Sequence, residues 1–153
     1  MSNRRATLRG TLLMIYIDTS IFVALCTAEP KSDYVDKWHE KSSARMISST
    51  WAFTEFSSAL SLKVRTNQIT EKQSREAWKK FDSLCQNDIE LLPIEAKTYY
   101  SAGILVVDSK SSLRAGDALH LATAKQYKSK SLATLDKVLA KNADRVKIKA
   151  VLI

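Results

Sequence analysis

The stretch Met14-Ile15-Tyr16-Ile17-Asp18 decides the fold class. Its four apolar or aromatic residues are typical of a short strand that is buried in a parallel sheet. Asp18 ends this run, and apolar side chains at helical spacing follow over residues 19–26. A buried strand that passes directly into a helix is the pattern of an α/β chain.

The same alternation of strands and helices continues to the end of the chain. We expect further strands at 46–48, 89–92, 131–135 and 147–152, with helices at 31–43, 51–65, 70–85, 94–108, 113–128 and 137–143. Thr70 and Gln73 resemble a capping box at the start of one of these helices. The predicted fold is therefore α/β, with a mainly parallel central sheet of about four to five strands flanked by helices.

Length and composition are those of one globular domain. The chain has 153 residues, of which 45% are hydrophobic and 26% are charged, and these values argue against bulk disorder. We place the domain at residues 14–153 and treat residues 1–13 as a basic, flexible extension, with Met1 or Met14 as the native start. The net charge of +8 favours a polyanionic partner.

The cysteines and the hydropathy of the sequence indicate in which cellular compartment the protein is expected. Cys26 and Cys85 lie far apart and belong to no Cys/His cluster, which argues against a zinc site and indicates reduced side chains that pack as small hydrophobes. The sequence contains no apolar run of the roughly 20 residues that a membrane span needs. We therefore expect a soluble, cytoplasmic protein with no membrane partner.

Four acidic residues fall where the carboxyl edge of such a sheet is expected. Asp18 and Asp136 each follow a strand, Glu55 lies in the first turns of the helix after the second strand, and Asp117 opens an apolar helix. Ligands of parallel α/β folds bind beyond this edge. Converging carboxylates repel one another unless a cation lies between them, and hard oxygen ligands favour Mg²⁺ or Mn²⁺.

Each of these residues also has a structural interpretation. Asp18 and Asp136 fit ordinary helix N-caps, and Glu55 fits a solvated helix surface. His120 is expected to be a packed helix histidine rather than a ligand or catalytic group. The basic residues of 125–130 and 137–149 either follow a phosphate backbone or form a solvated face. The three tryptophans are expected in core or dimer packing rather than in base stacking: Trp38, Trp51 and Trp78.

Three segments resemble the PIN-domain ribonucleases, and among them the VapC-type toxins of toxin–antitoxin pairs. They are Met14–Leu25, Thr50–Leu60 with Glu55, and the most specific one, Leu113-Arg-Ala-Gly-Asp-Ala-Leu-His-Leu-Ala-Thr-Ala; Thr134-Leu135-Asp136 resembles the last motif of the family. The resemblance implies that four acids are catalytic and bind one or two Mg²⁺ ions, with Mn²⁺ as the alternative metal: Asp18, Glu55, Asp117 and Asp136. It also implies site-lining roles for Thr19, Ser20, Arg114 and Thr134.

The resemblance further implies hydrolysis of RNA phosphodiester bonds, a cognate antitoxin that blocks the acidic site, and a homodimer. A catalytically silent RNA-binding or scaffold module with the same fold is the alternative. A phosphatase of the haloacid-dehalogenase kind ranks last, because its chemistry needs a second Asp two residues after the first, where this chain has Ser20.

Overall fold

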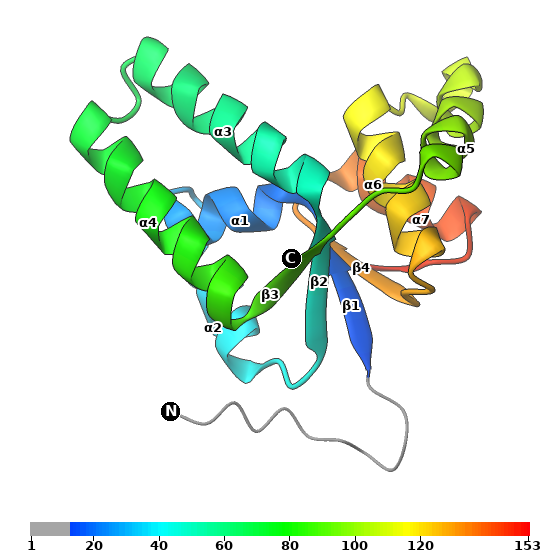
Figure 1. Ribbon diagram of the computed structural model, residues 1–153, viewed down its shortest axis with the longest axis horizontal. Coiled ribbons are helices and arrows are strands. Elements are labelled where there is room, and N and C mark those ends of the chain that lie inside the picture. The colour runs from blue at the N-terminus through cyan, green and yellow to red at the C-terminus, as the bar shows by residue number, and fades with distance from the viewer. Residues whose placement is uncertain (1–12) are drawn as a thin grey trace.

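Five parallel strands form one central sheet in the structure, a computed structural model that describes residues 13–153 (Figure 1). In spatial order they are β3 (Ile89–Leu92), β2 (Arg45–Ser49), β1 (Met14–Ile17), β4 (Ser131–Thr134) and β5 (Lys149–Leu152). The pairing aligns Ile15 with Met46 on one side and with Ser131 on the other. The predicted mainly parallel sheet is confirmed, and all its described pairs are parallel.

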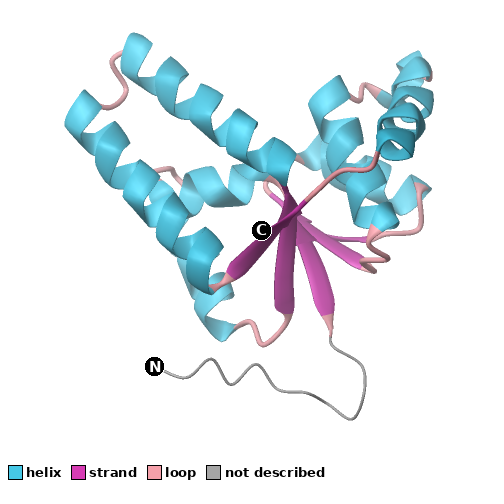
Figure 2. Cartoon of the chain, in the orientation of Figure 1, coloured by secondary structure: helices cyan, strands magenta, loops and turns pink. Residues whose placement is uncertain are grey.

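Seven α-helices of the described chain cover the two faces of this sheet (Figure 2). The first group is α1 (Thr19–Cys26), α2 (Ser32–Lys41), α3 (Thr50–Arg65) and α4 (Glu71–Asn87). The second group is α5 (Ala96–Val107), α6 (Ala115–Gln126) and α7 (Lys137–Arg145), with a short 3₁₀ turn at Ser109–Ser111 before α6. In Figure 1 the two groups lie on opposite sides of the strands, so the molecule has three layers.

The alternation of side chains along β1 divides the hydrophobic core in two. Ile15 and Ile17 pack in a cluster with α1 to α4, whereas Tyr16 packs in a second cluster with α5, α6 and α7. Neighbouring residues of a strand point to opposite faces, so a strand covered on both faces must be apolar throughout. This is why the run Met14–Ile17 shows no polar position.

The order of the strands places a topological switch point beside β1. The chain moves from β1 to β2 and β3 on one side, then crosses to β4 and β5 on the other. Connections on either side of such a point diverge, which opens a crevice beyond the carboxyl ends of the two strands. Asp18 follows β1 directly, and Thr134 ends the neighbouring β4.

The element boundaries agree closely with the expected ones. The predicted capping box is present, because the Thr70 hydroxyl accepts from the Gln73 amide and the Gln73 side chain accepts from the Thr70 amide. Residues 1–12 of the predicted extension at 1–13 lie outside the described residues. Cys26 and Cys85 are free, as expected. Within the described residues, every helix is too short or too polar to cross a membrane.

Candidate functional site at the carboxyl edge of the sheet

Two hydroxyl groups bind the side chain of Asp18 at the switch point. Its side chain accepts hydrogen bonds from Ser20 at 2.5 Å and from Thr134 at 2.6 Å, one on each carboxylate oxygen. Both hydroxyls accept a backbone amide in turn, from Leu135 and from Asp136 respectively. Because each hydroxyl oxygen already accepts a proton from the backbone, its own proton is directed to Asp18.

Burial dominates the electrostatics of Asp18. Only 4% of its surface is exposed, and the loss of water raises the pKa of its carboxyl above the usual value of 3.8. The attraction of His120 and the hydroxyls of Ser20 and Thr134 oppose this rise but do not overcome it. Asp18 is the N-cap residue of helix α1, as the capping interpretation expected, and the backbone amide of Ile21 also lowers the pKa of its carboxyl.

Glu55 reaches the same edge from helix α3. One of its carboxylate oxygens lies 2.6 Å from the Thr19 hydroxyl and 2.5 Å from Nε2 of His120. Burial alone raises the pKa of Glu55, but the bonds from His120 and Thr19 and the charge of Arg114 outweigh it and leave the pKa below 4.5. Glu55 is therefore an ionised, oriented carboxylate rather than a solvated surface acid.

Asp117 and Asp136 share one cation. The Arg114 guanidinium lies 3.5 Å from Asp117 and 3.9 Å from Asp136. Burial, followed by repulsion from Asp136, raises the pKa of Asp117, and Arg114 partly offsets this. Asp136 also accepts from the amides of Val138 and Leu139, so its predicted role as the N-cap of α7 is confirmed.

Gly116 brings helix α6 close to helix α3. A Cβ atom at this position would lie 2.9 Å from Oε2 of Glu55 and 3.2 Å from Nε1 of Trp51. The Nε1 donor of Trp51 is buried there without a hydrogen-bond partner among the described residues. The missing side chain of Gly116 therefore leaves Glu55 the space in which it meets His120 and Thr19.

His120 is the residue whose position was least apparent from the sequence. It is 1% exposed, so the expectation of a packed helix histidine is confirmed, but both its ring nitrogens have polar partners. Nδ1 lies 2.7 Å from the Tyr16 hydroxyl, and Nε2 contacts Glu55. The available signal was its spacing of three from Asp117, which puts both residues on one face of α6.

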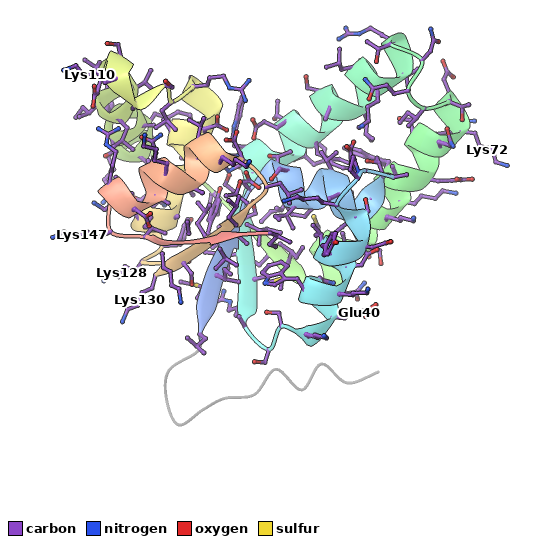
Figure 3. All side chains as sticks on the ribbon, turned by 180° about the vertical axis from the view of Figure 1, so that it is seen from behind. Glu40, Lys72, Lys110, Lys128, Lys130 and Lys147 are labelled. Carbon is purple, nitrogen blue, oxygen red and sulfur yellow. The ribbon has the colours of Figure 1, made fainter. Side chains whose placement is uncertain are left out.

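The lysines at the starts of β4 and β5 lie away from the acids. Lys128 and Lys130 precede β4 and Lys147 precedes β5, and Figure 3 shows the three together on one side of the molecule. The strands are parallel, so this is the amino edge of the sheet, opposite Asp18 and Asp136. These lysines cannot contact the same phosphate as the carboxylates. The three tryptophans pack against the two core clusters, as expected.

Together these features define the class of the protein: a three-layer α/β protein with a carboxylate-rich site at the switch point of a parallel sheet. The model of the PIN domain family matches residues 15–145, which is most of the chain. The chain belongs to the PIN-domain family. Among proteins of curated function, no sequence matches.

Solved structures share the fold at low sequence identity. VapC20 of Mycobacterium tuberculosis, a sarcin–ricin loop cleaving toxin, is 15% identical with a TM-score of 0.67, over 84% of this chain and 94% of that chain. VapBC2 of Rickettsia felis, bound to promoter DNA, is 14% identical with a TM-score of 0.63, over 91% and 98%. FitAcB of Neisseria gonorrhoeae is 18% identical with a TM-score of 0.60, over 90% and 96%.

Proposed function

We propose that this chain is a metal-dependent endoribonuclease and the toxin of a toxin–antitoxin pair. The observation that carries the proposal is that Asp18, Glu55 and Asp117 surround His120, which interacts electrostatically with all three carboxyls, at the switch point of a PIN domain. One structural neighbour is a toxin that cleaves the sarcin–ricin loop, and others are VapBC2 bound to promoter DNA and FitAB bound to a DNA fragment.

The donor set has the chemistry of a Mg²⁺ or Mn²⁺ site. Within residues 13–153, no three His, Cys, Asp or Glu side chains lie close enough together to hold a metal ion as they stand. Arg114 holds Asp117 and Asp136, but its side chain is 82% exposed and is free to turn outward. Carboxylate oxygens that face one another at a low-dielectric edge are the ligands that a hard divalent cation prefers.

In the proposed reaction, each side chain has a distinct task. Asp18, Glu55, Asp117 and Asp136 would hold the cation, which supplies an activated water and stabilises charge on the phosphoryl oxygens. Ser20 and Thr134 orient Asp18, and Thr19 orients Glu55. Arg114 stands at the mouth of the site with donors suited to a phosphate oxygen of RNA.

We further propose that the chain forms a homodimer and binds a cognate antitoxin. Helix α5 presents a solvent-exposed apolar stripe that the described chain leaves uncovered: Tyr100, Ile104 and Val107. Contiguous apolar surface of this kind is typical of an interface with a protein. The mass of the purified chain, measured by light scattering, tests the dimer, and co-purification with the neighbouring gene product tests the antitoxin.

The decisive experiment compares the full chain with Asp18→Asn on total cellular RNA, each with Mg²⁺ and with EDTA. Discrete fragments from the wild type with Mg²⁺ are expected, with cleavage by Asp18→Asn reduced by about 10²-fold or more, because one ligand of an electrostatic site is lost. Asp36→Asn is the matched control, because it removes the same charge from an exposed position on α2.

Two outcomes contradict the proposal. Equal cleavage by the wild type and Asp18→Asn, with or without EDTA, would place the activity outside this site. Binding of RNA without cleavage by either folded protein would favour the silent RNA-binding module instead.

A further inference from the structure

A chain of hydrogen bonds crosses the molecule beneath the acidic site. The Tyr16 hydroxyl lies 3.0 Å from the Ser49 hydroxyl and 2.7 Å from Nδ1 of His120. Nε2 of His120 lies 2.5 Å from Oε1 of Glu55. The chain links β1 and β2, through the α6 side of the sheet, to the carboxylate carried by α3.

Tyr16 and His120 are held firmly enough to act as a fixed support. Tyr16 is fully buried and His120 is 1% exposed, and their rings meet edge to face with centroids 5.7 Å apart. The two residues come from different elements, so neither ring can turn without disturbing the core around β1 and α6. The side chain of Glu55, in contrast, is partly exposed, so its carboxylate depends on such contacts for its orientation.

One proton of this chain follows from the carboxylate at its end. An ionised carboxylate can only accept, so Nε2 of His120 must carry a proton where it meets Glu55. On the other side of the ring, the Tyr16 hydroxyl donates to Ser49 and its oxygen lies against Nδ1. Tyr16 is therefore tied to β2 and at the same time contacts the imidazole ring.

We propose that His120 is a positioning residue that holds Glu55 in its place in the site, and that Tyr16 holds the His120 ring in the orientation that lets it do so. This inference rests on the proposed function, because it assumes that Glu55 is a metal ligand. Partners that orient a ligand from behind set its basicity and direction, and their loss costs about 10- to 100-fold in metal affinity.

Two substitutions of His120 separate positioning from packing. His120→Gln places an amide donor near the position of Nε2, whereas His120→Asn places one near Nδ1 and leaves Glu55 without it. We expect Mn²⁺ affinity, measured by calorimetry on the full chain, to stay within about threefold for His120→Gln and to fall about 10- to 100-fold for His120→Asn. Tyr16→Phe is expected to fall between them.

The controls keep the outcomes distinct. His39→Gln changes the other histidine of the chain, which lies near Asp88 on the far side of the fold, and is expected to leave Mn²⁺ affinity unchanged. Circular dichroism and thermal unfolding identify any variant that fails to fold. Equal affinities of the wild type, His120→Gln and His120→Asn would overturn the positioning role while leaving the nuclease proposal intact.

Nitrogen NMR of the metal-free chain tests the bond from Nε2 to Glu55 independently of metal binding. With two histidines in the sequence, the His39→Gln spectrum assigns the signals of His120. The expected result is a proton on Nε2 in the wild type, with the Nε2 signal shifted in Glu55→Gln. An Nε2 without a proton in the wild type would overturn the inference, even if the wild type bound no Mn²⁺ and the metal-dependent function itself had failed.

Discussion

The two sides of the acidic site are held by different means. Asp18 and Glu55, which we call the inner acids, accept from the hydroxyls of Ser20, Thr134 and Thr19, and Glu55 also contacts the buried His120. Asp117 and Asp136, the outer acids, are bound by Arg114, which is exposed, and Asp136 also by the first turn of α7. Hydroxyls and a packed histidine orient a carboxylate from fixed positions, whereas an exposed guanidinium neutralises it and can leave.

The difference indicates a division of labour across the site. The inner acids are set in place by the core before any substrate arrives, and preorganised groups of this kind contribute most to binding a cation or a transition state. The outer acids can exchange Arg114 for another positive group. Substitutions that disturb the inner acids should therefore have the larger effects on activity.

Gly116→Ala is expected to have the largest effect, because the change lies outside the four acids and yet displaces Glu55. The new Cβ would lie 2.9 Å from Oε2 of Glu55, so the carboxylate must shift, and this disturbs the contacts of Oε1 with His120 and Thr19. We expect RNA cleavage to fall about 10- to 100-fold. Stability should change little, because the gain of about 1 kcal/mol in helix propensity offsets the crowding at Trp51.

Gly103→Ala on α5 is the matched control. A Cβ there meets no atom of the described chain within 4 Å, so the variant should gain stability and keep full activity. Full RNA cleavage by Gly116→Ala would show that the exact position of the Glu55 carboxylate does not matter for activity.

The pH dependence of unfolding should have opposite signs for the two inner acids in EDTA. The pKa of Asp18 is raised by burial, so the folded state binds that proton more tightly. The wild type should then lose unfolding free energy relative to Asp18→Asn as the pH rises from 3.8 toward the folded-state pKa. Each unit of pKa difference is worth about 1.4 kcal/mol.

Glu55 should behave in the opposite way. Its pKa lies below 4.5 in the folded chain, so its contribution to stability is present above that pH and is lost as the pH falls through the folded-state pKa. Urea titrations of the wild type, Asp18→Asn and Glu55→Gln over this range measure both slopes. If both slopes had the same sign, folding would shift the pKa of Asp18 and the pKa of Glu55 in the same direction, and the expected difference between them would be refuted.

The smallest effects are expected at Asp136. There, two substitutions distinguish the loss of the helix cap from the loss of the negative charge. Asp136→Asn keeps an oxygen for the amides of Val138 and Leu139, whereas Asp136→Ala removes it. Only the alanine variant should lose stability, by about 1 kcal/mol, as measured by thermal unfolding. A cleavage loss at Asp136→Asn as large as that at Asp18→Asn would show that the outer acids contribute equally.

Much of the site was predictable, but one part of its support was not. The run Met14–Ile17, followed by Asp18, carries strong local signals, because a strand buried on both faces must be apolar and its end marks the edge of the sheet. Ser20 and Thr134 were expected to line the site, and the structure adds that both hydroxyls donate to Asp18. His120 and Tyr16 carry no such signal, because either residue fits a buried aromatic position equally well.

The sequence by itself determined the α/β alternation, the parallel sheet and the edge at which the four acids fall, since these follow from hydrophobic periodicity and from where each strand ends. Only the tertiary structure decided which partner each acid meets. Tyr16 and His120 are 104 residues apart and Thr19 and Glu55 are 36 apart, and such pairs are fixed by the order of the strands and by how α3 and α6 pack. Hydrogen-bond partners depend on ångström-scale distances between distant segments, and local sequence patterns do not encode those distances.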